Sequence, residues 1–147
     1  MRDLSVFISL ATALATGVSG AIAALLWWRA DPRPWVWSLL RGGQVVAVIA
    51  AGVACVRYFA GPQPTDDLFY LYAVLPVAVA FIAEQLRLAT AETILEDRGL
   101  ENAQAVGKLP EDEQNALVTA ILCRELGIVA AGSLVACFLA LRAWGVA

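Results

Sequence analysis

Four long apolar stretches, separated by short breaks, dominate this 147-residue chain. Hydrophobic residues make up 61% of the sequence and charged residues 16%, whereas a soluble domain has about 45–50% and 25%. The apolar residues stand in continuous blocks rather than at the spacing of a half-buried helix or strand, which indicates that lipid surrounds the folded chain. We therefore predict an all-α integral membrane protein, with four transmembrane helices in an antiparallel bundle that forms a single domain over residues 1–147.

Proline and glycine mark the breaks between the apolar stretches. Two prolines interrupt the helix in the turn at 29–34, and Gly-Pro-Gln-Pro does so at 61–64, because proline cannot continue a helix from its interior. Pro76 falls near the middle of the third stretch, where we expect a kink. The predicted spans cover about residues 4–28, 35–60, 68–90 and 117–143.

The polar segment between the third and fourth spans keeps a helical pattern. The pattern continues to about Asn102, breaks near Gly107 and restarts at Pro110. At 1.5 Å per residue, the two parts that flank the break are roughly 29 and 24 Å long, which is enough to leave the bilayer. We therefore predict that helices three and four extend into a cytoplasmic helical hairpin over about residues 84–125.

The tip of this predicted hairpin is acidic. Its carboxylates are Glu92, Glu96, Asp97, Glu101, Glu111, Asp112 and Glu113. One interpretation is a docking arm for a basic partner. The other is a solvated polar surface that also stays away from anionic lipid. The sequence leaves both interpretations open.

Two pairs of charged residues mark the hairpin ends of the third and fourth apolar runs. Glu84 and Arg87 follow the third run, and Arg124 and Glu125 precede the fourth. Charges at this depth are costly and usually have partners. Because consecutive helices lie side by side, we expect Glu84 to meet Arg124. Arg87 is then expected to meet Glu125. The four side chains form either a clamp that fixes helix register or an ion or proton site in which Glu84 titrates.

Small residues recur at four-residue intervals in three of the spans, which allows helix backbones to approach closely. The series are Ala13, Gly17, Ala21 and Thr16, Gly20, Ala24 in span one, Ala47, Ala51 and Ala50, Ala54 in span two, and Gly127, Ala131 and Gly132, Ala136, Ala140 in span four. They predict packing within the bundle or, as the alternative, self-association through span one. Gln44, at a shallow depth in span two, is expected to hydrogen-bond across helices.

The composition argues against several classes of function. The chain has no histidine and a net charge of −3, so it lacks the commonest metal ligand and general base and the basic face that nucleic acid requires. Its cysteines form no C-x-x-C motif, which argues against a zinc or dithiol site. No general base stands beside the scattered serines Ser5, Ser9, Ser19 and Ser133. We expect no enzymatic activity, no cofactor and no metal.

The remaining features favour a membrane accessory protein. Seven basic residues lie in or beside the loops after spans one and three, against three on the other side. This bias predicts that loops 29–34 and 90–116 are cytoplasmic and that both termini are not. The alanine-rich, lysine-poor composition favours a bacterial plasma membrane.

The predicted function is a small non-catalytic multi-pass protein, an accessory or scaffold subunit that docks a partner on its acidic hairpin. Its expected partners are membrane lipids and either another protein or a second copy of itself. The alternative is a small transporter or channel built around Glu84 with Arg87, Gln44 and Arg124. That alternative requires a homo-oligomer, because four helices rarely enclose a permeation path alone.

Overall fold

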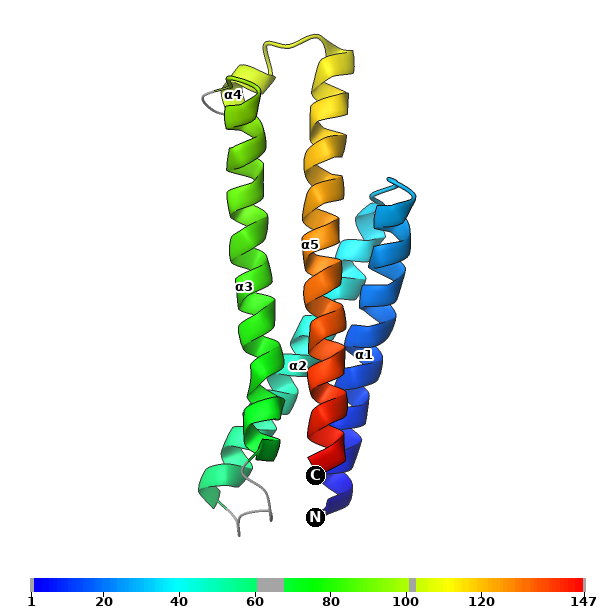
Figure 1. The fold of residues 1–147 in the computed structure, drawn as a ribbon, viewed down its shortest axis with the longest axis vertical. Helices are drawn as coiled ribbons and strands as arrows, with labels where there is room; N and C mark the ends of the chain where they lie inside the picture. Colours follow the sequence, from blue (N-terminus) through cyan, green and yellow to red (C-terminus); the bar gives the residue numbers. More distant parts are fainter. Residues whose placement is uncertain (1, 61–67, 101–102, 147) are drawn as a thin grey trace.

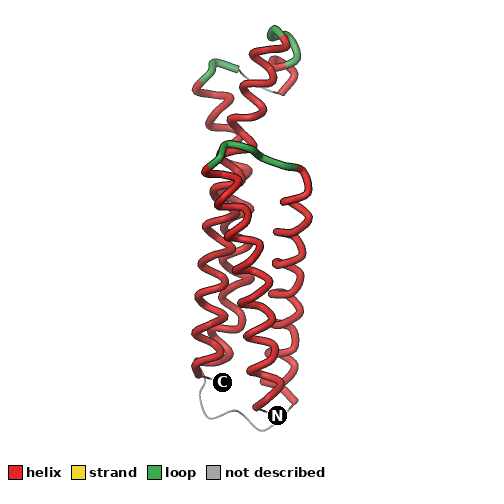
Figure 2. The backbone as a smooth tube through the Cα atoms, turned by 90° about the vertical axis from the view of Figure 1, so that its right-hand side faces the viewer, coloured by secondary structure: helices red, strands yellow, loops and turns green. Residues whose placement is uncertain are grey.

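The computed structural model describes residues 2–60, 68–100 and 103–146, which are helical apart from short turns (Figure 1, Figure 2). The helices are α1 (Arg2–Trp28), α2 (Pro34–Ala60), α3 (Leu68–Asp97), α4 (Ala103–Val106) and α5 (Glu111–Val146). The four long helices are each long and apolar enough to cross a membrane. The prediction of an all-helical chain with four such helices is confirmed, and no strand occurs within the described ranges. Glu101, one of the residues predicted at the acidic tip, lies outside these ranges.

α3 ends earlier than the sequence predicts. It stops at Asp97 instead of near Asn102, because Gly99 takes a φ of +67°, a conformation that glycine adopts without steric cost. The Gly99 amide donates to the carbonyl of Glu96 and the next amide donates to that of Leu95, each at 2.9 Å. This is the hydrogen-bond pattern of a Schellman helix end. The short helix α4, which was not predicted, follows this turn.

The four long helices pack in a ring in which each contacts two neighbours. α5 lies against α1 and α3, and α2 lies against the same two helices. Figure 1 shows α2 running obliquely behind α5, from the upper end of α1 toward the lower end of α3. Both chain termini lie at the lower end of the bundle in this view. Direct contact between α2 and α5 is slight, so side chains have to bridge the space between these two helices.

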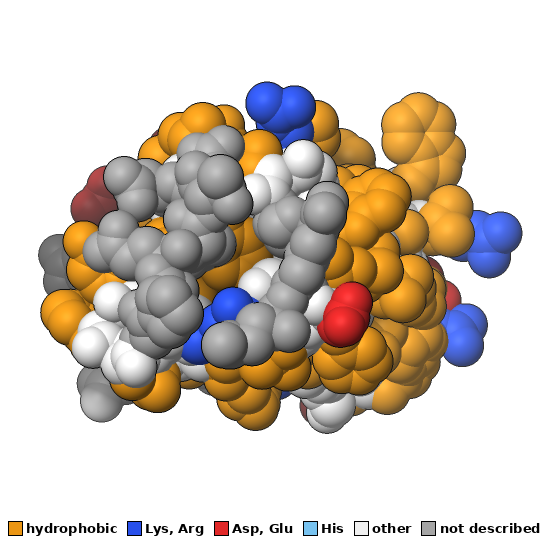
Figure 3. Space-filling model, turned by 90° about the horizontal axis from the view of Figure 1, so that it is seen from below, with side chains coloured by type: hydrophobic (Ala, Val, Ile, Leu, Met, Phe, Trp, Pro, Cys, Tyr) orange, Lys and Arg blue, Asp and Glu red, His pale blue; other side chains and the backbone are white. Residues whose placement is uncertain are grey.

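Small side chains lie inside the bundle and large apolar ones outside, which is the reverse of a soluble protein. Small residues fill much of the interior, among them Ala23, Ala47 and Ala54. Large apolar side chains are exposed, including Phe7, Leu14, Ile49, Phe81 and Phe138. The view from below in Figure 3 shows hydrophobic side chains over much of the described surface. Such an exterior is unusual for a soluble monomer and suits lipid, in which helices associate through small residues.

Two glycines bring α5 close to its neighbours. A β-carbon on Gly20 of α1 would lie 3.0 Å from the Cβ atom of Ser133 and 3.1 Å from the backbone nitrogen of Leu134 in α5. A β-carbon on Gly132 of α5 would lie 2.9 Å from the Cβ atom of Ala83 in α3. The small-residue series of α1 and α5 therefore serve packing within the chain, and self-association through α1 stays a prediction.

α5 continues well beyond the end of α1. Trp27, at the end of α1, packs so closely on Gly127 that a β-carbon there would lie 2.6 Å from the indole nitrogen. The residues of α5 that precede this contact therefore extend past α1 by about 24 Å. α3 stays in contact with α2 as far as Arg87, whose guanidinium stacks on a tryptophan of that helix. We call the projecting residues, 88–100 and 103–126, the arm; Figure 1 shows them rising above α1 and α2.

The close packing predicts opposite responses to alanine at two glycines. Gly20→Ala adds a β-carbon against the α5 backbone, and overpacking of this kind costs about 1–3 kcal/mol. Gly52→Ala, on α2, meets nothing within 4 Å, so it gains up to about 1 kcal/mol of helix propensity. We expect the thermal unfolding midpoint in detergent to fall for the first variant and to hold or rise for the second. Equal midpoints would contradict the tight α1–α5 contact.

Candidate functional site

Four polar side chains join α2 to α3. Arg41 Nη1 lies 3.0 Å from Glu84 Oε1 and donates a hydrogen bond to Gln44 Oε1, also at 3.0 Å. Gln44 Nε2 donates in turn to Glu84 Oε1 at 3.3 Å. Arg87 Nε lies 3.2 Å from the other carboxylate oxygen of Glu84. We call these four residues the charged cluster, in which an arginine engages each oxygen of Glu84.

Helix geometry explains how the charged cluster assembles. Arg41 and Gln44 are three residues apart on α2, and Glu84 and Arg87 have the same spacing on α3. Residues three apart on a helix are neighbours on its surface. The side chains of Glu84 and Arg87 are only 22% and 23% exposed, whereas the longer reach of an arginine stem lets Arg41 lie half exposed at the edge. The Arg87 guanidinium also lies 5.4 Å from the centre of the Trp37 ring, which is a cation–π distance.

Arg87 carries the least satisfied polar atom of the charged cluster. Its Nε is the only buried side-chain nitrogen or oxygen without a hydrogen-bond partner in the part of the chain that the structure describes. The contact with Glu84 is therefore an ion pair held by charge rather than a well-directed hydrogen bond. Glu125 of α5 lies within electrostatic range of both residues. The negative charges of Glu84 and Glu125 together balance the positive charges of Arg41 and Arg87.

The predicted pairing of Glu84 with Arg124 is wrong, and Arg87 and Glu125 interact electrostatically without forming an ion pair. Glu84 pairs with the two arginines of the charged cluster, and neither Arg124 nor Glu125 makes an ion pair with another described residue. The register of the two helices explains the difference. Ala83 packs at Gly132, eight residues along α5 from Arg124, so Glu84, the residue after Ala83, is offset from Arg124 by about 10 Å. Glu84, predicted as the root of the hairpin, lies inside the four-helix part instead.

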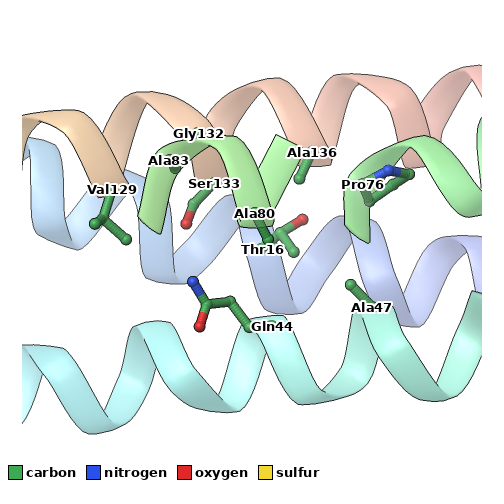
Figure 4. Close-up of a pocket in the computed structure, with 10 residues that line it drawn as sticks. All are labelled: Thr16, Gln44, Ala47, Pro76, Ala80, Ala83, Val129, Gly132, Ser133 and Ala136. Carbon is green, nitrogen blue, oxygen red and sulfur yellow. The ribbon is translucent and has the colours of Figure 1, made fainter. Parts of the chain in front are cut away.

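A small cavity lies next to the charged cluster, between the four long helices (Figure 4). Its lining consists of Thr16, Gln44, Ala47, Pro76, Ala80, Ala83, Val129, Gly132, Ser133 and Ala136. The volume open to the centre of a water molecule is about 10 Å³, which is room for about one water. Gln44 belongs to both the charged cluster and the cavity wall, so it connects the ion pairs with the interior of the bundle.

The buried face of α1 carries a stripe of hydroxyl side chains that was not predicted from the sequence. Its members are Ser5, Ser9, Thr12, Thr16 and Ser19, each at most 5% exposed. They recur at intervals of four and three residues, which is the spacing of one helix face. The signal was present in the sequence, but it appears only when serines and threonines are counted together. At the lower end of the stripe, Arg57 of α2 donates a hydrogen bond to Ser5.

The acidic residues of the predicted tip lie on the arm and are exposed. Those within the described ranges are Glu92, Glu96 and Asp97 on α3 and Glu111, Asp112 and Glu113 on α5. None of them makes an ion pair with another described residue. Gln114 fixes the adjoining turn, because its Nε2 donates to the carbonyl of Leu109 at 2.7 Å. The carboxylates of the tip therefore face solvent on an ordered helical support.

The described residues offer no arrangement that binds a metal. Within these ranges, no group of three or more cysteine, aspartate or glutamate side chains is placed to hold a metal ion. The three cysteines, Cys55, Cys123 and Cys137, are free thiols.

The geometry predicts which charge pair is energetically coupled. Glu84→Gln and Arg87→Gln each remove one partner of the same largely buried pair, so the double variant should lose less stability than the sum of the singles. Residues in one network typically couple by about 0.5–3 kcal/mol. Glu84→Gln combined with Arg124→Gln should be additive to within about 0.5 kcal/mol. The measurement is unfolding in detergent, and coupling found only with Arg124 would contradict the charged cluster.

No protein-family model, curated protein or solved structure matches this chain. The function therefore has to follow from the chain's own residues. These provide an apolar four-helix bundle, a charged cluster beside a small cavity, and an acidic arm.

Proposed function

We propose that the chain is a small non-catalytic multi-pass membrane protein, an accessory or scaffold subunit that docks a basic partner protein on its arm. In this proposal the four candidate spans form an antiparallel bundle in the membrane, and the arm stands in the cytoplasm. The observation that carries the proposal is the arm itself. It is helical, it projects beyond α1 and α2 (Figure 1), and its exposed carboxylates have no ion pair among the described residues.

The charge of the chain is divided unevenly between arm and bundle. Over residues 88–126 the sequence has eight acidic and three basic side chains, a net charge of −5, while the remainder carries a net charge of +2. At physiological salt, charges separated by more than about 8 Å are largely screened from one another. The tip of the arm lies about 24 Å beyond the end of α1, so the bundle's positive charge does not neutralise it. A lysine- and arginine-rich protein surface is the complementary partner.

The charged cluster supports this proposal through a mechanical role. It ties α2 to α3 near the level at which the arm leaves the bundle. Both oxygens of Glu84 are engaged by arginines, which favours a fixed clamp over a group that releases and rebinds an ion. Such a clamp would hold the base of α3, and hence the arm, at a constant angle to the bundle.

The proposed orientation follows from the distribution of basic residues. The excess of arginine and lysine in and beside loops 29–34 and 90–116 favours a cytoplasmic position for both loops, with the termini on the opposite side. Exposed tryptophans, among them Trp27, Trp28 and Trp35, gather at the end of the bundle from which the arm projects, as in an interfacial aromatic belt. The alanine-rich, lysine-poor composition supports a bacterial plasma membrane as the location.

Neutralising the tip of the arm is expected to abolish docking. The combined variant Glu111→Gln, Asp112→Asn and Glu113→Gln removes three charges from the first turn of α5. Purification from native membranes in mild detergent, followed by mass spectrometry, should recover a basic partner with the unaltered protein and lose it with this variant. Arg98→Gln with Lys108→Gln is the matched control, since it changes charges of opposite sign near the same tip and should leave binding equal or stronger. A partner retained by the neutralised arm would contradict the docking proposal.

A second candidate function, the homo-oligomeric transporter or channel, is favoured by the polar interior. The hydroxyl stripe of α1 and the cavity beside Gln44 provide polar groups where a purely structural bundle needs none. Under this candidate, Glu84→Gln abolishes proton or ion flux in proteoliposomes, while Glu92→Gln on the arm leaves the flux unchanged. Crosslinking in native membranes should then show a homo-oligomer. A monomeric species without flux would eliminate this candidate and leave the docking proposal intact.

A further inference from the structure

Ser133 places an unpartnered hydroxyl in the cavity beside the charged cluster. Only 8% of the residue is exposed, and its hydroxyl makes no hydrogen bond with any residue that the structure describes. Figure 4 shows its oxygen directed across the cavity toward Gln44. The hydroxyl therefore keeps both its donor and its acceptor capacity for a ligand in the cavity.

Two further polar groups converge on the same cavity. Gln44 uses its oxygen to accept from Arg41 and one amide hydrogen to donate to Glu84, which leaves its second amide hydrogen unused. Its nitrogen lies on the cavity side in Figure 4. Thr16 donates its hydroxyl hydrogen to the carbonyl of Thr12 at 2.7 Å, which leaves the lone pairs of its oxygen free to accept. The cavity wall thus offers one donor, one acceptor and one hydroxyl that can act as either.

Size and charge decide which ligand fits. The volume of about 10 Å³ open to the centre of a water molecule admits one water and no organic molecule. A cation is disfavoured because the Gln44 amide presents a hydrogen rather than an oxygen to the cavity. Water needs two to four polar partners, and the wall supplies three.

We propose that the cavity is a binding site for one ordered water molecule, which bridges Gln44 of α2, Thr16 of α1 and Ser133 of α5. The water accepts a hydrogen bond from the Gln44 amide and donates one to the Thr16 oxygen. With the Ser133 hydroxyl it forms a third hydrogen bond, in which either group can be the donor. It thereby connects α2 with α5, two helices that have little direct contact. It also fixes the amide orientation with which Gln44 donates to Glu84. This inference does not depend on the docking proposal.

The test detects the water directly at Gln44. Full-length protein labelled with ¹⁵N-glutamine in nanodiscs should show NOE and ROE cross-peaks of opposite sign between bulk-frequency water and the Gln44 side-chain amide, the signature of a long-lived bound water. Gln44→Leu identifies the resonance. Gln104, which is exposed on α4 of the arm, provides an internal reference for short-lived surface hydration. Absence of the long-lived signal at Gln44 in the unaltered protein overturns the proposal.

Matched variants separate this water from general disturbance of the interior. Thr16→Val and Ser133→Ala each remove one of its partners and should reduce the Gln44 cross-peak to the level of Gln104. Thr12→Val is the control, because Thr12 makes the same kind of bond to the carbonyl four residues back but lines a neighbouring cavity without Gln44. It should leave the cross-peak unchanged, and equal loss in all three variants contradicts the assigned site. Backbone amide spectra confirm that each variant is folded before its cross-peak is interpreted.

Discussion

Close approach of helix backbones is the constraint on which this fold depends. In the lipid environment proposed for this bundle, apolar side chains gain nothing by leaving one hydrocarbon environment for another, so helices are held by contact and hydrogen bonding rather than by hydrophobic exclusion. α5 meets this requirement on both sides. Gly20 of α1 seats against its backbone near Ser133, and its own Gly132 receives Ala83 of α3. These contacts set the register of three helices, and the positions of the charged residues follow from that register.

The register also explains why charges gather between α2 and α3. α2 runs obliquely and has little contact with α5, so long polar side chains occupy the space that small residues fill elsewhere. Arg41 and Gln44 reach across to Glu84, and Arg87 completes the group from the same helix. In a medium of low polarity, this mutual satisfaction is what makes four polar groups tolerable. The same reasoning accounts for the hydroxyls of α1, three of which donate their hydrogens to backbone carbonyls of their own helix.

Much of the architecture was predictable because it rests on local signals. Uninterrupted apolar length and proline placement defined the long helices, and acidic residues next to a proline marked the start of α5. Arg87 stands three residues from Glu84 on the same helix, but the two α2 partners of Glu84, Arg41 and Gln44, were not predictable, since they depend on how α2 packs on α3, which no single helix encodes. The end of α3 was misplaced because one glycine in a left-handed conformation outweighs a continuing helical pattern. The hydroxyl stripe was visible in principle, because it needs only a period and no knowledge of neighbours.

The unbroken course of α5 joins the arm to the bundle without a hinge. Its 36 residues contain no proline and span about 54 Å, and Trp27 rests on Gly127 at a point near the middle. The outer and inner halves of the helix therefore share one continuous hydrogen-bonded backbone. A load on the outer end is carried directly to the close contacts at Gly20 and Gly132, because no flexible joint lies between them.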